Sequence, residues 1–162
     1  MQILTALSTI LLPLNTLTSS VTLYTTLLAA TNLQHYEPAT KKAATVSATA
    51  DTQLQKTRYT LGAGILTSLS SSVCSMLGLY WTFTNGTSKG DVQRNLFLMA
   101  AVNAGLCLWV RRYIAGFWAG RAKVPVVGGR YNDGVRAAER AVGLLRVVAV
   151  GWACVLACNW EW

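Results

Sequence analysis

Four long apolar stretches, separated by short polar ones, dominate this sequence. The clearest covers residues 95–110, which carry no charged side chain and are followed by the pair Arg111-Arg112. A helix needs about 20 mostly apolar residues to cross the hydrocarbon of a bilayer. Four stretches approach or exceed that length, at about 3–30, 59–84, 92–113 and 141–160. The pattern predicts an all-α membrane protein whose single domain, residues 1–162, is an antiparallel bundle of four transmembrane helices.

The first stretch differs from a secretory signal, which has a basic start and an apolar region of only about 7–15 residues. Residues 1–36 contain no Lys or Arg, and their apolar part is much longer. We therefore interpret residues 1–30 as a retained span. It is rich in Ser and Thr, whose hydroxyls bond to carbonyls of their own helix or to a neighbouring helix. Pro13 removes one backbone donor and predicts a kink.

Small residues recur at helical spacing in the later spans and indicate close helix packing. In lipid, helices associate through such residues because their backbones can approach closely. The candidate seams are Gly64/Ser68/Ser72, Ser71/Ser75 and Ala149/Ala153/Ala157. Asn103 lies near the centre of the third span, where we expect its amide to bond to a neighbouring helix.

The connectors differ in how they join the spans. Residues 43–59 continue into the second span without a helix breaker, which favours a second helix that projects from the membrane for several turns. Residues 119–140 contain Gly128-Gly129 and Asn132-Asp133-Gly134, which are typical turn sequences. We expect the last helix to start near Val135 and to enter the membrane near Ala141.

Charge sets the expected orientation. Only 12% of residues are charged and the net charge is +8, whereas soluble domains average about 25% charged residues. Twelve of the fourteen cations lie in 31–58, in 111–140 or at Arg146. Positive loops face the cytosol, so we expect the basic connectors there, in contact with anionic lipid head groups rather than with nucleic acid. The sequon at Asn85 would face the opposite compartment, in a turn too short to favour glycosylation.

The spans offer little for catalysis, since they contain no Asp, Glu or His, and intramembrane catalysis and proton transport usually need such groups. No cofactor and no metal site is expected. The four cysteines, Cys74, Cys107, Cys154 and Cys158, are interpreted as small apolar fillers.

The first hypothesis is therefore a non-catalytic accessory or scaffolding subunit of a membrane assembly, with a protein partner or a homo-oligomer. An alternative hypothesis is a small carrier or channel lined by the Ser/Thr-rich first helix. An endoplasmic reticulum or other secretory-pathway membrane is favoured over the mitochondrial inner membrane.

The second hypothesis is an enzyme acting on a lipophilic substrate through an Arg/Tyr/Asn site at the cytosolic mouth. Its candidate residues are Tyr59, Asn103, Arg111, Arg112, Tyr131, Arg136, Arg140 and Arg146. In length and span number the chain is similar to the glutathione-using MAPEG family and to fungal anthrone oxygenases, which are membrane enzymes. The segment 136–141 (RAAERA) also resembles the Glu-Arg-rich helix of MAPEG proteins, but it opens the last span and lacks the downstream Asn and Glu.

Overall fold

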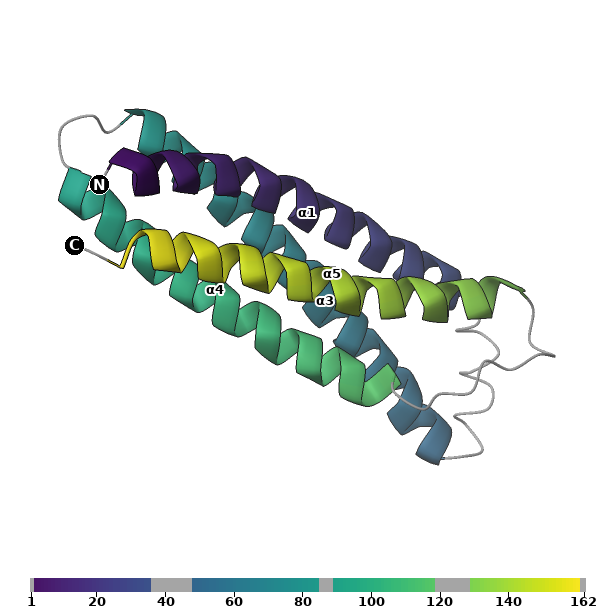
Figure 1. Cartoon of the computed structure of the whole chain (residues 1–162). Coiled ribbons are helices and arrows are strands. Elements are labelled where there is room, and N and C mark those ends of the chain that lie inside the picture. Colours follow the sequence, from purple (N-terminus) through teal and green to yellow (C-terminus); the bar gives the residue numbers. More distant parts are fainter. Residues whose placement is uncertain (1, 36–47, 85–88, 119–128, 161–162) are drawn as a thin grey trace.

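The chain forms four long helices (Figure 1) in a computed structural model that describes residues 2–35, 48–84, 89–118 and 129–160. The helices are α1 (Gln2–Gln34), α3 (Ala48–Thr84), α4 (Lys89–Trp118) and α5 (Gly129–Cys158). Each holds a segment long and apolar enough to cross a membrane: Ala6–Gln34, Thr52–Thr84, Gly90–Trp118 and Tyr131–Cys158. The predicted fold, an all-α integral membrane protein with four transmembrane helices, is confirmed.

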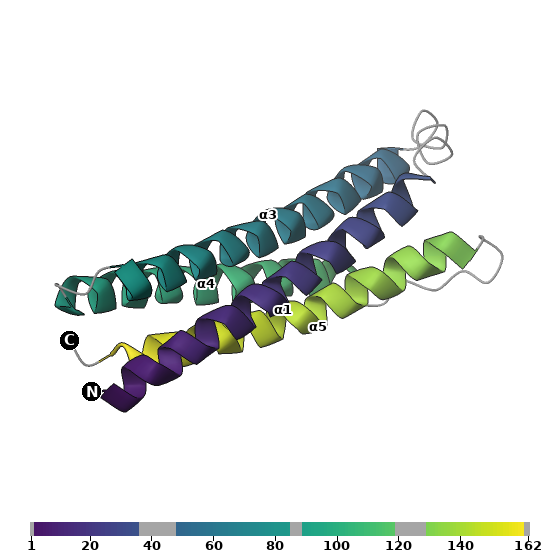
Figure 2. The ribbon, with the colours of Figure 1, turned by 90° about the horizontal axis from the view of Figure 1, so that it is seen from above.

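The helices form a ring in which each one runs antiparallel to its two neighbours. α1 packs between α3 and α5, and α4 closes the ring between α5 and α3 (Figures 1 and 2). The α1–α5 contact is the most extensive and the α3–α4 contact the least extensive of these four pairs. The start of α1, the end of α5 and the junction of α3 with α4 therefore lie at one end of the bundle. The 36–47 and 119–128 connections join the helices at the other end, called here the basic end.

Buried positions repeat every three or four residues along the helices. On α5 they include Ala138, Ala141, Leu145, Val148, Trp152 and Val155, and on α4 they include Leu96, Ala100, Asn103, Cys107, Val110 and Ile114. Alternating steps of three and four place side chains on one slightly twisted stripe, the arrangement that packs helices at small angles as in coiled coils. The ring is held together by these stripes.

The outer surface is apolar, while much of the interior is polar. Large hydrophobic side chains point outward on every helix, including Leu17 (65% exposed), Leu66 (68%), Val102 (68%) and Val150 (56%). The buried set includes Ser8, Asn15, Ser19, Thr22, Thr26, Thr60, Thr67, Ser68, Ser71, Ser72, Ser75, Asn103 and Asn159. An apolar exterior of this extent is stable against acyl chains, because large exposed apolar patches are unfavourable in water.

One local prediction was wrong, and another holds only in part within the bundle. Asn132-Asp133-Gly134 is not a turn, because α5 already begins at Gly129. The reason is packing: a Cβ on Gly134 would lie 2.9 Å from Cγ of Leu33, so the glycine lets α5 continue close along the end of α1. The alanine seam of α5 is divided, since Ala149 is buried whereas Ala153 and Ala157 are exposed. The sequon at Asn85 lies outside the described residues.

Candidate functional site

A stripe of small polar side chains on α1 faces the interior of the bundle. The inward positions from Ser8 to Ala29 are separated by alternating steps of four and three residues. Five of these seven positions are polar: Ser8, Asn15, Ser19, Thr22 and Thr26. The Ser/Thr content of the first span is thus partly concentrated on its buried face.

Several interior hydroxyls are bonded within their own helix. Thr22 Oγ1 donates to the carbonyl of Thr18 at 2.7 Å, and Thr26 Oγ1 donates to the carbonyl of Thr22 at 2.8 Å. On α3, Ser68 Oγ donates to the carbonyl of Gly64 at 2.6 Å. Such bonds satisfy the hydroxyl donor without a partner helix. The interior can therefore be polar while few of its hydrogen-bonding groups are left without a partner.

One cluster instead joins three helices at mid-bundle. Ser19 Oγ of α1 and Ser71 Oγ of α3 lie 2.9 Å apart, and the indole Nε1 of Trp152 on α5 donates to Ser71 Oγ at 2.7 Å. With the Asn15 amide oriented to satisfy both of its ends, its oxygen accepts from Trp152 Nε1 at 3.0 Å and its nitrogen donates to the Val148 carbonyl at 3.3 Å. We call Asn15, Ser19, Ser71 and Trp152 the central cluster.

Glycines allow this close approach. A Cβ on Gly151 would fall 2.5 Å from the carboxamide end of Asn15, and a Cβ on Gly64 would fall 3.0 Å from Cγ2 of Thr26. Close backbone contact at small residues strengthens packing between helices in lipid. α1 therefore packs closely against α5 at Gly151 and against α3 at Gly64. The Gly64/Ser68/Ser72 seam fits this arrangement, since all three residues are buried.

Asn103 behaves differently from the prediction. It is only 3% exposed, but its Nδ2 donates to the carbonyl of Met99, one turn earlier on α4, at 2.9 Å. Its Oδ1 is buried and has no hydrogen-bond partner among the described residues. The expected bond to a neighbouring helix is therefore not formed, because the amide folds back on its own helix.

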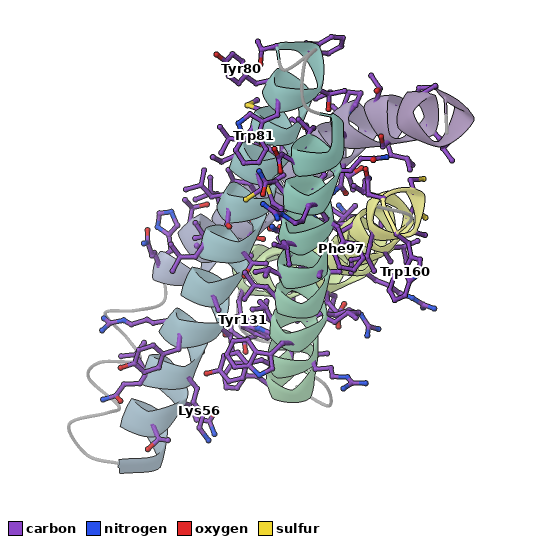
Figure 3. The ribbon with its side chains drawn as sticks, turned by 90° about the vertical axis from the view of Figure 1, so that its left-hand side faces the viewer. Lys56, Tyr80, Trp81, Phe97, Tyr131 and Trp160 are labelled. Atoms are coloured by element: carbon purple, nitrogen blue, oxygen red, sulfur yellow. The ribbon has the colours of Figure 1, made fainter. Side chains whose placement is uncertain are left out.

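Aromatic side chains gather at both ends of the bundle. Tyr80 and Trp81 lie far from Lys56 (Figure 3). At the same end, Phe97, in the first third of α4, and Trp160, just past the end of α5, meet edge to face at 5.6 Å. Towards the basic end, Phe117 packs edge to face on Trp118 at 5.2 Å. Aromatic residues at both ends are typical of the two membrane–water interfaces.

A crevice opens between α3 and α4 at the basic end. Its volume is about 400 Å³, and it is lined by Lys56, Thr60, Arg112, Tyr113, Gly116 and Phe117. We call it the α3–α4 crevice. A second hollow of about 330 Å³ lies between α1 and α3, where Leu33, Leu61 and Ile65 make its lining mainly apolar and Arg58 supplies a cation. Both hollows are open rather than enclosed.

The enzyme candidates are not gathered in either hollow. Only Arg112 lines one of them. Tyr59 is 65% exposed, and Arg136, Arg140 and Arg146 are exposed on α5, where Arg136 forms a 3.8 Å ion pair with Asp133. Of the other candidates, Asn103 is buried, and Arg111 and Tyr131 are half-buried. A catalytic role for this set stays a prediction.

The sequence alone did not lead us to the central cluster, nor to the finding that Lys56 and Arg112 line the same crevice. The signal for the cluster was present, because Asn15 and Ser19 lie four residues apart on a stripe with steps of four and three. The pairing had no comparable signal, since the two cations are 56 positions apart in the chain.

Comparison with protein-family models, with curated proteins and with solved structures gave no match.

Proposed function

We propose that this chain is a non-catalytic accessory or scaffolding subunit of a membrane assembly. The observation that carries the proposal is the chemistry of the interior. Apart from cysteines, the buried polar residues in the described ranges are Ser, Thr and Asn, with no Asp, Glu, His, Lys or Arg among them. Their side chains donate hydrogen bonds either to a neighbouring helix or to backbone carbonyls of their own helix, which stabilises the bundle. An interior of this kind is suited to maintaining a shape in the membrane.

The outward face of α5 supports a protein partner. Ala153, Cys154 and Ala157 are exposed on its second half. Nearer its middle, Gly143 is exposed with open space around it, but Val147 and Val150 are exposed there as well. The outward face of α1 is instead covered by large side chains, among them Ile10, Leu14 and Leu17. A helix of a partner or of a second copy could approach the second half of α5 closely at Ala153 and Ala157, since small residues favour such contacts in lipid.

The proposed orientation places the basic end in the cytosol. Residues 31–58 and 111–140, which carry eleven of the fourteen cations, include the helix ends that lie at this end, and short basic loops are retained on the cytosolic side. The membrane would be that of the endoplasmic reticulum or another secretory-pathway compartment. Both termini and the α3–α4 junction would then face away from the cytosol.

The test is purification of the tagged full chain in a mild detergent, followed by mass spectrometry of the proteins that accompany it. We expect a protein present in constant ratio to the chain, or a defined homo-oligomer. A monomer that copurifies with no protein, from cells and in detergents that preserve other membrane complexes, would contradict the proposal.

A second candidate, a small carrier, is favoured by the polar stripe of α1. An apolar interior would have counted against transport, but here five inward positions of one helix are polar. The test is flux of small neutral and monovalent solutes into proteoliposomes containing the chain. Transport that exceeds that of protein-free vesicles and is reduced by Thr22→Val/Thr26→Val, whose hydroxyls bond to carbonyls of their own helix, would support the carrier and contradict a purely structural interior.

A further inference from the structure

The α3–α4 crevice combines two cations with an apolar wall. Lys56 reaches it from α3 and Arg112 from α4, while Tyr113, Gly116 and Phe117 supply much of the remaining lining. It lies where the contact between neighbouring helices is least extensive. The site is therefore accessible from the outer surface of the bundle between two spans.

The electrostatics of the crevice favour an anion. Among the residues that the structure describes, no acidic side chain lines it, and neither of its cations belongs to the ion pairs Arg94–Asp91 and Arg136–Asp133. Two cations converging on one hollow attract a phosphate more strongly than either does alone, because their fields add. Lys56 and Arg112 are therefore suited to share one anionic group.

The position of the crevice indicates where that anion comes from. Lys56 lies four residues inside the Thr52–Thr84 segment, and Arg112 lies six residues before the end of the Gly90–Trp118 segment. Both are thus within about 10 Å of an end of a span, given a rise of about 1.5 Å per residue. Lys and Arg side chains at this depth extend outward to the lipid phosphates, and Tyr113 and Phe117 are of the aromatic kind found at that boundary.

We propose that the α3–α4 crevice is a binding site for one anionic glycerophospholipid. The phosphate lies between the Lys56 ammonium and the Arg112 guanidinium, and an acyl chain runs along the outer surface of α3 and α4. Arg112 can present two N–H donors to the phosphate, and Lys56 acts as a point charge. This inference deepens the proposed function, because it rests on the membrane orientation given above and names the lipid partner of the basic end.

The test is native mass spectrometry of the full chain in mild detergent, titrated with dioleoyl phosphatidylserine or with dioleoyl phosphatidylcholine. We expect one phosphatidylserine to be retained in preference to phosphatidylcholine. The double variant Lys56→Gln/Arg112→Gln should weaken that binding about tenfold or more, since each cation near an anionic surface contributes substantially. Inorganic phosphate, titrated over the same range, should not displace the lipid.

A matched control removes the same charge elsewhere. Arg136→Gln/Arg140→Gln also lowers the net charge of the basic end by two, but these residues are exposed on α5 and do not line the crevice. Binding should change less than about twofold in this control, because screening limits the effect of distant exposed charges. Equal losses in both double variants would show attraction to the basic end as a whole and would overturn the site.

A second pair of variants tests the crevice without changing any charge. Gly116 lines it, and a Cβ there would meet no atom within 4 Å, as is also true of Gly105 on the same helix. Gly116→Leu should fill the crevice and weaken phosphatidylserine binding, whereas Gly105→Leu should not. Unchanged binding in both Gly116→Leu and the double Lys56/Arg112 variant, or displacement by inorganic phosphate, would overturn the proposal. Neither result would affect the accessory-subunit proposal, which depends on a protein partner.

Discussion

Trp152 of α5 and Ser71 of α3 are joined by a hydrogen bond across the centre of the bundle. The indole Nε1 donates to the serine Oγ at 2.7 Å, and Trp152 is fully buried. α3 and α5 are diagonal in the ring and make few other contacts. Since Ser71 also lies 2.9 Å from Ser19 of α1, this bond ties the diagonal pair to a third helix.

The first prediction concerns this bond. Trp152→Phe and Ser71→Ala should each destabilise the folded bundle, and the two together should lose less than the sum. We expect a coupling energy of about 0.5–1.5 kcal/mol, the range of hydrogen bonds between helices in membranes. The measurement is unfolding by titration with SDS in mixed micelles. Trp109→Phe is the control, because Trp109 is 64% exposed, and additive losses would show that the bond contributes nothing.

The second prediction concerns the contact of α1 with α5 at Gly151. Gly151→Ala should destabilise the bundle by about 1–3 kcal/mol, because overpacking forces neighbouring helices apart and the added Cβ would fall 2.5 Å from the Asn15 amide. Gly143→Ala, at an exposed position with open space, should be neutral or slightly stabilising, since alanine favours helix over glycine. Partial rescue of Gly151→Ala by Asn15→Ser would identify Asn15 as the obstacle. Equal effects of Gly151→Ala and Gly143→Ala would contradict this account.

The third prediction contrasts two buried asparagines. Asn103→Leu should leave the stability unchanged or raise it by about 1–2 kcal/mol, because it removes a buried oxygen that has no partner. Asn15→Leu should lower it, since Asn15 contacts both Trp152 and the Val148 carbonyl. The SDS titration used for Trp152 measures both changes. A large loss with Asn103→Leu would show that Oδ1 has a partner in the membrane, such as a bound water.

The fourth prediction concerns the small-residue face of α5. Ala153→Leu/Ala157→Leu should reduce copurification of a protein partner, or shift the homo-oligomer to monomer, because bulky side chains prevent close approach. Ala101→Leu is the control, since Ala101 is also exposed but lies on α4. The amount of partner per chain, quantified by mass spectrometry, is the readout. Retention of the partner by the α5 variant and its loss from the control would place the interface on α4.

The sequence by itself determined the class of the protein and the number of its helices. In lipid, each backbone N–H and C=O must be bonded inside the structure, so an apolar stretch of sufficient length becomes a helix whatever its neighbours are. For this reason the four spans could be predicted from hydropathy, and the second helix could be expected to extend past its span towards residue 48.

Tertiary structure decided what depends on contacts between helices. Asn132-Asp133-Gly134 has turn composition, yet it is helical because Gly134 packs on Leu33 of α1. Asn103 bonds to its own helix although its position suggested a partner. Ser71 meets Trp152 across 81 positions of sequence, and Lys56 shares a crevice with Arg112. Hydropathy reports how each residue partitions between lipid and water, whereas these pairings depend on the register and rotation of helices that only their mutual packing sets.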